Sequence, residues 1–140
     1  MTSLPSLLGA LMAILQAHSL CEKVTSIETK EFSPDQFFFK VRANLTGENK
    51  LQVRIYCNQG HVDYAYQVFT AVPLLRWDNK EEFRHLATYP HHYHDEQGKV
   101  KLSPLTGDPL RDIEVVLREV SGFLTGEKTN TKSEESLGDA

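Results

Sequence analysis

The sequence predicts an α+β fold: an N-terminal helix, an antiparallel sheet of five or six strands, and a C-terminal helix packed on one face of the sheet. Two patterns indicate this order. Near the N-terminus hydrophobic residues recur every three or four positions, as on one side of a helix. From residue 37 onward they recur every second position, as in strands with one buried face. A length of 140 residues with 40% hydrophobic content suits one domain, expected at 1–124.

The first helix is expected over residues 4 to about 18. Pro5 is tolerated in a first turn, and the apolar stripe consists of Leu4, Leu7, Leu8, Leu11, Ile14 and Leu15. This run is too short to span a membrane, and neither a preceding Lys or Arg nor a small-residue cleavage pattern marks it for export. We therefore expect a cytoplasmic protein with no membrane segment, in which Cys21 and Cys57 are buried free thiols.

The sheet is expected to be a meander of strands joined by short turns. Strict alternation predicts strands at 37–45, 51–57 and 62–68, separated by the turns "TGEN" and "CNQG". Next, "VPLLRWD" predicts a short strand, followed by a loop at 79–90. "HHYH" and "KVKL" can pair across the turn "DEQG", and residues 26–31 can add an edge strand.

The second helix is expected to begin after Asp108, a favourable N-cap residue, with Pro109 at its first position. Its apolar stripe consists of Leu110, Ile113, Leu117, Val120 and Leu124. The remaining segment is polar and charged with almost nothing to bury, so residues 125–140 are predicted to be a disordered acidic tail.

The charge of the chain limits the ligands that it can bind. A formal net charge of −4 argues against a general nucleic-acid-binding protein. Residues 37–101 nevertheless have a small excess of Lys and Arg over Asp and Glu, whereas both ends are acidic. An anionic ligand would therefore bind to the middle of the chain.

The stretch "YPHHYHD" places three histidines within four positions. On a strand, His92 and His94 would point to one face, while His91 and Tyr93 would point to the other. Polar side chains nearby in the predicted sheet and loop complete the set of candidate functional residues: Arg54, Tyr64, Tyr66, Arg76, Asp78 and His85.

Three roles are open for this set. His92, His94 and Asp78 could hold zinc or another divalent metal, because two histidines on one strand face can reach the same ion. Alternatively, histidines could transfer protons while arginines hold a phosphate and tyrosines orient a hydroxyl, as RNA cleavage without a metal requires. The structural alternative is a solvated histidine loop, half-buried tyrosines and an Arg76–Asp78 ion pair worth under about 1 kcal/mol.

"RWDN" followed by "TYPHHYH" resembles the "RWDNAPHH…TFPHHKH" pattern of the TumE family of toxin–antitoxin proteins. "YAY" resembles the Y-x-Y of the preceding strand in that family, and "SPDQFFFKVRANL…LQVRIY" resembles its first hairpin. The resemblance spans residues 5–124. The matching positions are Tyr64, Tyr66, Arg76, Trp77, Asp78, Asn79, Pro90, His91, His92 and His94.

This resemblance implies a bacterial type II toxin, encoded beside a helix-turn-helix antitoxin that silences it, with RNA as its target. By analogy it also implies a shape similar to the small RelE-like ribonucleases. The chain departs from the family pattern at two places. Residues 80–85, "KEEFRH", stand where the family has "APHH", and Tyr93 stands where it often has Lys. If the missing histidines are catalytic, this chain is a weak toxin.

We therefore predict a cytoplasmic, growth-inhibiting toxin that acts as a ribonuclease without a metal or other cofactor. Its expected partners are RNA and the helix-turn-helix antitoxin. The sequence leaves open whether the chain forms a homodimer. The alternatives are a non-catalytic protein-interaction module and a metal-dependent hydrolase. The predicted catalytic residues are His91, His92, His94, Arg76, Asp78, Tyr64 and Tyr66. The residues predicted to hold RNA are Arg54, Arg76 and Arg84.

Overall fold

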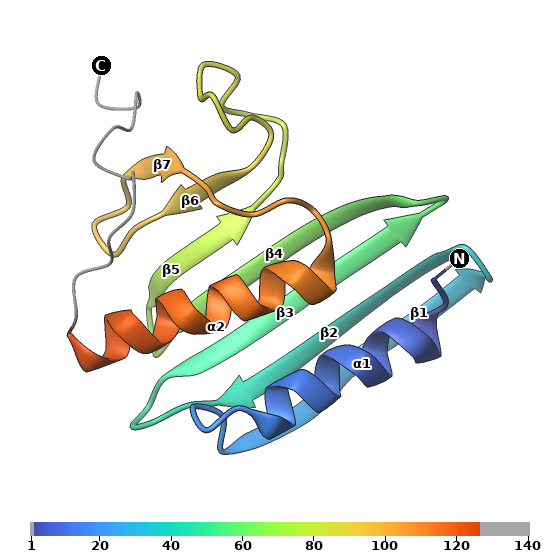
Figure 1. Ribbon diagram of the computed structural model, residues 1–140, viewed down its shortest axis with the longest axis horizontal. Helices are drawn as coiled ribbons and strands as arrows, with labels where there is room; N and C mark the ends of the chain where they lie inside the picture. The colour runs from blue at the N-terminus through green and yellow to red at the C-terminus, as the bar shows by residue number, and fades with distance from the viewer. Residues whose placement is uncertain (1, 127–140) are drawn as a thin grey trace.

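The computed structural model describes residues 2–126, which form two helices and one seven-stranded sheet (Figure 1). The predicted α+β class is confirmed. The predicted tail lies outside the described residues, apart from Thr125 and Gly126, which end the second helix. The elements are α1 Leu4–Ala17, β1 Lys23–Ser33, β2 Gln36–Asn44, β3 Lys50–Asn58, β4 His61–Phe69, β5 Pro73–Asp78, β6 His92–His94, β7 Val100–Leu102 and α2 Pro109–Thr125.

The sheet is a pure meander, because every strand pairs antiparallel with the next strand in the sequence. The prediction of five or six strands is wrong: the described residues form seven. β1 is exposed along most of its length, so it has no alternation of buried and exposed residues that would show its extent. β6 and β7 have three residues each, which is too short for a periodic signal.

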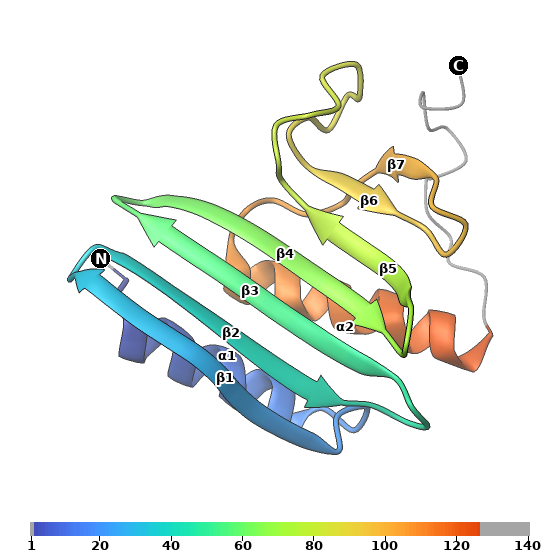
Figure 2. The ribbon, with the colours of Figure 1, turned by 180° about the vertical axis from the view of Figure 1, so that it is seen from behind.

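Both helices cover one face of the sheet, as predicted (Figure 1). Among the described residues, none forms a helix over the opposite face (Figure 2). Alternation explains the difference, because every second residue of β2 and β3 points to the helices and is buried. Each large apolar side chain buried there contributes about 1.5–3 kcal/mol. The fully buried residues between helices and sheet include Leu11, Leu15, Phe37, Phe39, Leu51, Ile55, Tyr66, Trp77, Ile113 and Leu117.

Local signals set the ends of both helices. The Ser3 hydroxyl accepts a hydrogen bond from the backbone N–H of Ser6, and the Asp108 carboxylate accepts one from that of Leu110. These bonds satisfy N–H groups that have no partner within the helix. Gly126 ends α2 with a φ of 79°, a left-handed conformation that glycine adopts without a steric penalty.

Two further findings bear on the sequence predictions. Among residues 2–126, no helix has both the length and the apolar character needed to cross a membrane. Both cysteines are free; Cys57 is buried and Cys21 is partly exposed. Burial raises the pKa of both thiols, so both are poor nucleophiles.

The packing of α1 yields a stability prediction. Leu11 is fully buried, so Leu11→Ala leaves a cavity and should lower the free energy of unfolding by about 2–5 kcal/mol. Leu8→Ala makes the same chemical change on the same helix at a half-buried position and should cost about 1 kcal/mol. Urea unfolding followed by circular dichroism measures both. Equal losses would contradict the position of α1 on the sheet.

Candidate functional site

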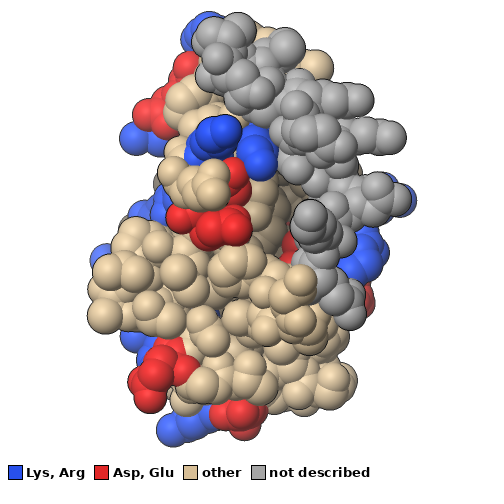
Figure 3. Space-filling model, turned by 90° about the vertical axis from the view of Figure 1, so that its left-hand side faces the viewer, with Lys and Arg blue, Asp and Glu red and all other residues tan. Residues whose placement is uncertain are grey.

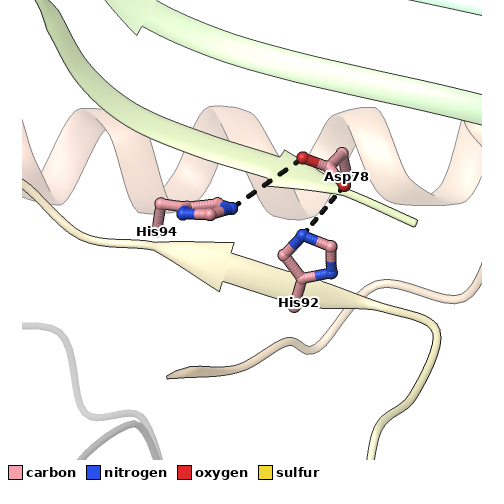
Figure 4. Close-up of side chains that lie close together, drawn as sticks. All are labelled: Asp78, His92 and His94. Atoms are coloured by element: carbon pink, nitrogen blue, oxygen red, sulfur yellow. Dashed lines mark ion pairs between the residues drawn. The ribbon is translucent and has the colours of Figure 1, made fainter. Parts of the chain in front are cut away.

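The pairing of β5 with β6 brings four polar side chains together on the face without helices. Asp78 lies opposite His92 and Arg76 lies opposite His94 in the antiparallel register. Because these residues alternate with Trp77 and Tyr93, they point away from the helices. Asp78, His92 and His94 therefore come close together, although the two histidines follow Asp78 by 14 and 16 positions in the sequence (Figure 4).

The Asp78 carboxylate is the centre of this cluster. Only 8% of its side chain is exposed. Oδ2 accepts a hydrogen bond of 2.8 Å from Arg76 Nε, and Oδ1 accepts one of 2.9 Å from the backbone N–H of Lys80. His92 Nε2 lies 2.9 Å from Oδ1 and His94 Nε2 lies 3.9 Å from Oδ2. The carboxylate is thus surrounded by donors and cations, which a buried anion needs.

His92 is the buried member of the pair of histidines, with 1% of its side chain exposed. Its Nδ1 lies 3.2 Å from the carbonyl oxygen of Pro90, so Nδ1 carries a proton and donates it there. Its Nε2, although close to Asp78, makes no aligned hydrogen bond. The Phe83 ring lies edge-on to the imidazole at 4.7 Å between centroids and closes it from solvent.

His94 differs from His92 because 29% of its side chain is exposed. Its ring meets those of His92 and Phe83 edge-on, at 5.0 and 6.0 Å between centroids. Of the two histidines on this face, His94 is therefore the one whose ring a dissolved molecule can reach.

The ionisation of the cluster follows from these contacts. Burial alone would raise the pKa of Asp78, but His92, Arg76 and the backbone N–H of Lys80 outweigh it, so the pKa lies well below its usual value. Burial alone would lower the pKa of His92, but the Asp78 carboxylate outweighs it and raises the pKa. The pKa of His94 is lowered, by burial first and then by the charges of His92 and Arg76. The site thus combines a buried histidine whose pKa is raised with an accessible histidine whose pKa is lowered.

A hollow of about 550 Å³ adjoins the cluster on the same face. Ala65 lies between Arg54 and Asp78 in the strand register, and its small side chain leaves the space open. The Arg54 guanidinium lies over the Phe38 ring, 5.0 Å from its centroid. The hollow is lined by Arg54, Asp63, Tyr64, Ala65, Arg76, Asp78, Asn79, Lys80 and Glu81.

His91 and the two candidate tyrosines lie on the opposite, helix-covered side. The Tyr64 hydroxyl and His91 Nδ1 form a hydrogen bond of 2.7 Å, and the two rings stack at 5.8 Å between centroids. Tyr66 is fully buried, and its hydroxyl has no hydrogen-bond partner. Burial, followed by the Asp112 carboxylate, raises the pKa of both phenols, so both stay protonated. None of the three joins the Asp78 cluster, although Tyr64 also lines the adjoining hollow.

The other predicted residues fall outside the cluster as well. Arg84 is exposed on the loop after β5, with its guanidinium over the Tyr89 ring, 5.3 Å from the centroid. It does not line the hollow. His85 is exposed on the same loop, with its ring 6.5 Å from that of Phe83. Both residues can reach the cluster only if the loop moves.

Sequence reasoning assigned no role at this site to three residues that shape it. The Asn79 amide accepts a hydrogen bond from the Tyr64 N–H and donates one to the Val62 carbonyl, so it pairs with β4 as a strand residue would. Phe83 covers the histidines. The feature of the sequence that could have indicated this role is a single aromatic residue within the charged segment 80–85. Buried Asp112 accepts hydrogen bonds from the backbone of Thr106 and Gly107 and holds the segment that follows β7.

One side of the molecule carries charged side chains of both signs. Figure 3 views the end of the molecule at the left of Figure 1, where basic and acidic side chains lie close together beside a broad uncharged area. On that side the described residues form no extended surface of one sign.

The fold and the cluster define a class: a single-sheet α+β domain whose uncovered face carries a buried carboxylate held by two histidines and an arginine. Residues 11–124 match the family described as Toxin TumE, and the chain belongs to this family. The resemblance seen in the sequence is therefore confirmed. No curated protein and no solved structure matches the chain, so the analogy to RelE-like folds stays a prediction.

The Asn79 contacts yield a second stability prediction. Asn79→Asp keeps an acceptor for the Tyr64 N–H but removes the donor to the Val62 carbonyl, which should cost about 1–3 kcal/mol of unfolding free energy. Asn58→Asp makes the same change at an exposed end of β3 and should stay within about 0.5 kcal/mol of the unchanged protein. Urea unfolding measures both. A neutral Asn79→Asp would show that the amide does not hold the end of β5.

Proposed function

We propose that this chain is the toxin of a type II toxin–antitoxin pair and that it cleaves RNA in the cytoplasm without a metal ion. Membership of the Toxin TumE family supports the first part. One observation carries the second: an accessible histidine, His94, lies beside a buried carboxylate and next to a hollow lined by two arginines.

In the proposed reaction, the phosphate of the scissile bond lies in the hollow against Arg54 and Arg76. Guanidinium groups bind phosphate oxygens with paired hydrogen bonds and stabilise the additional negative charge of the phosphorane. Arg76 suits this role because its Nε holds Asp78, which leaves its remaining N–H groups for other partners; one of them donates to the Gln67 side chain at 3.3 Å.

His94 is the proposed proton acceptor. Its imidazole is exposed enough to meet a ribose 2′-hydroxyl, and its lowered pKa favours the neutral form that accepts a proton. The 2′-oxygen would then attack the neighbouring phosphorus and form a 2′,3′-cyclic phosphate, while the bond from phosphorus to the 5′-oxygen breaks and the leaving 5′-oxygen takes a proton from solvent water. The imidazolium so formed lies near Asp78, whose charge stabilises it.

His92 has a different proposed role. It is too buried to contact RNA, so we assign it as a positioning residue that holds Asp78 through the ion pair. This changes the division of labour expected from the sequence, in which His91, His92 and His94 shared the proton transfers. His91 and Tyr64, bonded to each other on the helix side, are assigned to stability.

The proposed partner follows from the family. A toxin of this class requires an antitoxin in the same cell, and membership therefore implies one. We propose that this antitoxin is a helix-turn-helix protein that binds the chain and prevents RNA cleavage. The competing hypothesis is a non-catalytic interaction module, in which the histidine cluster only stabilises the fold.

The first functional prediction concerns His94. His94→Gln removes the proton acceptor and should lower the rate of RNA cleavage about 100-fold or more, with loss of growth arrest when the chain is expressed in bacteria. Cleavage of total cellular RNA by the purified chain, followed on gels, measures the rate. His61→Gln is the matched control, because the exposed His61 side chain does not line the hollow and pairs with Asp63 at 3.1 Å, not with Asp78.

Equal cleavage by His94→Gln and the unchanged protein would exclude His94 as the proton acceptor. Growth arrest with no RNA cleavage by either protein would favour the interaction module. The comparison requires that both variants unfold at the same urea concentration as the unchanged protein.

The second functional prediction compares the contributions of Arg54 and Arg84 to RNA binding. Arg54→Gln should weaken RNA binding and reduce the slope of log affinity against log salt by about 0.7–1, since one phosphate contact is lost. Arg84→Gln, a matched change outside the hollow, should leave both quantities unchanged. Fluorescence anisotropy with a labelled single-stranded RNA at several salt concentrations measures them. A larger effect at Arg84 would move the RNA path onto the loop.

A further inference from the structure

We infer that Asp78, His92 and His94 form a reversible zinc site, and that a bound ion blocks the RNA cleavage proposed above. The site itself rests on geometry alone, whereas the block rests on the proposed function. Figure 4 shows the three side chains directed toward one another from β5 and β6.

The spacing of the three donor atoms suits one ion. One nitrogen from each histidine and one carboxylate oxygen lie within 4.8 Å of one another. Two ligands of a tetrahedral zinc ion at about 2.0–2.1 Å are about 3.3 Å apart. His92 Nε2 and Asp78 Oδ1 are already 2.9 Å apart, and His94 Nε2 is 3.9 Å from the other carboxylate oxygen. Only the partly exposed ring of His94 has to move appreciably.

The surroundings of His92 supply an independent observation. Histidines that bind metals usually donate the proton of the second ring nitrogen to a carbonyl or carboxylate oxygen, which orients the ring. His92 Nδ1 lies 3.2 Å from the Pro90 carbonyl oxygen in this arrangement. Its Nε2 points into the cluster from a side chain that is 1% exposed, and it has no aligned hydrogen bond. Its contact with Asp78 at 2.9 Å is an ion pair without hydrogen-bond alignment, so this buried nitrogen can still gain an aligned partner, which a metal ion between the two side chains would provide.

The choice of zinc follows from the ligand set. Two imidazoles and a carboxylate suit zinc and related transition ions better than magnesium or calcium, which prefer oxygen ligands. Three protein ligands leave the fourth position to water.

The same surroundings make the binding reversible. Asp78 already accepts hydrogen bonds from Arg76 and from the backbone of Lys80. The Arg76 charge repels a second cation, so the ion binds more weakly than a permanently held one. The fold does not need the ion, because the carboxylate has partners without it.

The inhibition by zinc follows because the ion and the proton of the ribose 2′-hydroxyl compete for one nitrogen atom of His94. A zinc ion bound by His94 Nε2 occupies the lone pair that accepts the 2′-hydroxyl proton in the proposed reaction. The ion also draws His94 toward Asp78 and away from solvent. Zinc would therefore inhibit this ribonuclease, which is the opposite of its effect on a metal-dependent hydrolase.

The first measurement is binding by the full-length chain. Zinc is titrated in competition with a chromophoric chelator, and cobalt(II) is added separately as a spectroscopic probe of a tetrahedral site. We expect one ion per chain, with affinity reduced roughly tenfold or more in His94→Gln and unchanged in His61→Gln. His94→Gln is preferred to a change at buried His92, since it is less prone to unfold the protein. Absence of zinc and cobalt binding by the unchanged chain would overturn the site and leave the ribonuclease proposal intact.

The second measurement is RNA cleavage by the same protein, first with a chelator and then with zinc in excess. We expect cleavage with the chelator, loss with zinc, and recovery when the chelator is restored. Faster cleavage with zinc would overturn both the block and the metal-free mechanism. Zinc binding by a chain that never cleaves RNA would overturn the proposed function, and the block with it, while the site would stand.

Discussion

The buried carboxylate of Asp78 is the constraint on which the arrangement of the site depends. A carboxylate removed from water is stable only if donors and cations surround it, and breaking a buried pair by removing one partner costs about 3–5 kcal/mol. Arg76 from the same strand, His92 and His94 from β6, and the backbone N–H of Lys80 just after β5 meet this need. The short β6 strand is thus held in register by the pairing of charges as well as by its few backbone hydrogen bonds.

Because side chains point alternately to the two faces along β5 and β6, the residues that stabilise the fold lie on one face and the polar cluster lies on the other. On the helix side, Trp77 packs against Tyr93 with ring centroids 5.0 Å apart. On the open side, the residues between them form the polar cluster. A change in one layer therefore leaves the other in place, provided that the strands stay paired. The aromatic layer can hold the cluster rigidly without contacting any ligand, which is what a preorganised site requires.

The open face makes the cluster accessible, and the loop after β5 restricts that access. Phe83 covers His92 and leaves His94 partly exposed, so two adjacent histidines have different environments. The segment in which this chain departs from the family pattern, residues 80–85, carries Phe83, so the departure lies in the loop that covers the cluster.

By itself the sequence determined the α+β class, both helices with their caps, the central strands and the family. These features follow from local chemistry: the spacing of apolar residues, capping side chains and a contiguous motif. Alternation alone also placed His92 and His94 on one face. Only the tertiary structure decided the length of β1 and that β1, β6 and β7, which the sequence offered only as possible strands, all join the sheet, because exposed or three-residue strands have no periodic signal. It also decided that His92 is buried, that Tyr66 lies in the core, and that Phe83 closes the cluster. Burial depends on what a distant segment places over a residue, and the spacing of neighbours in the chain does not contain that information.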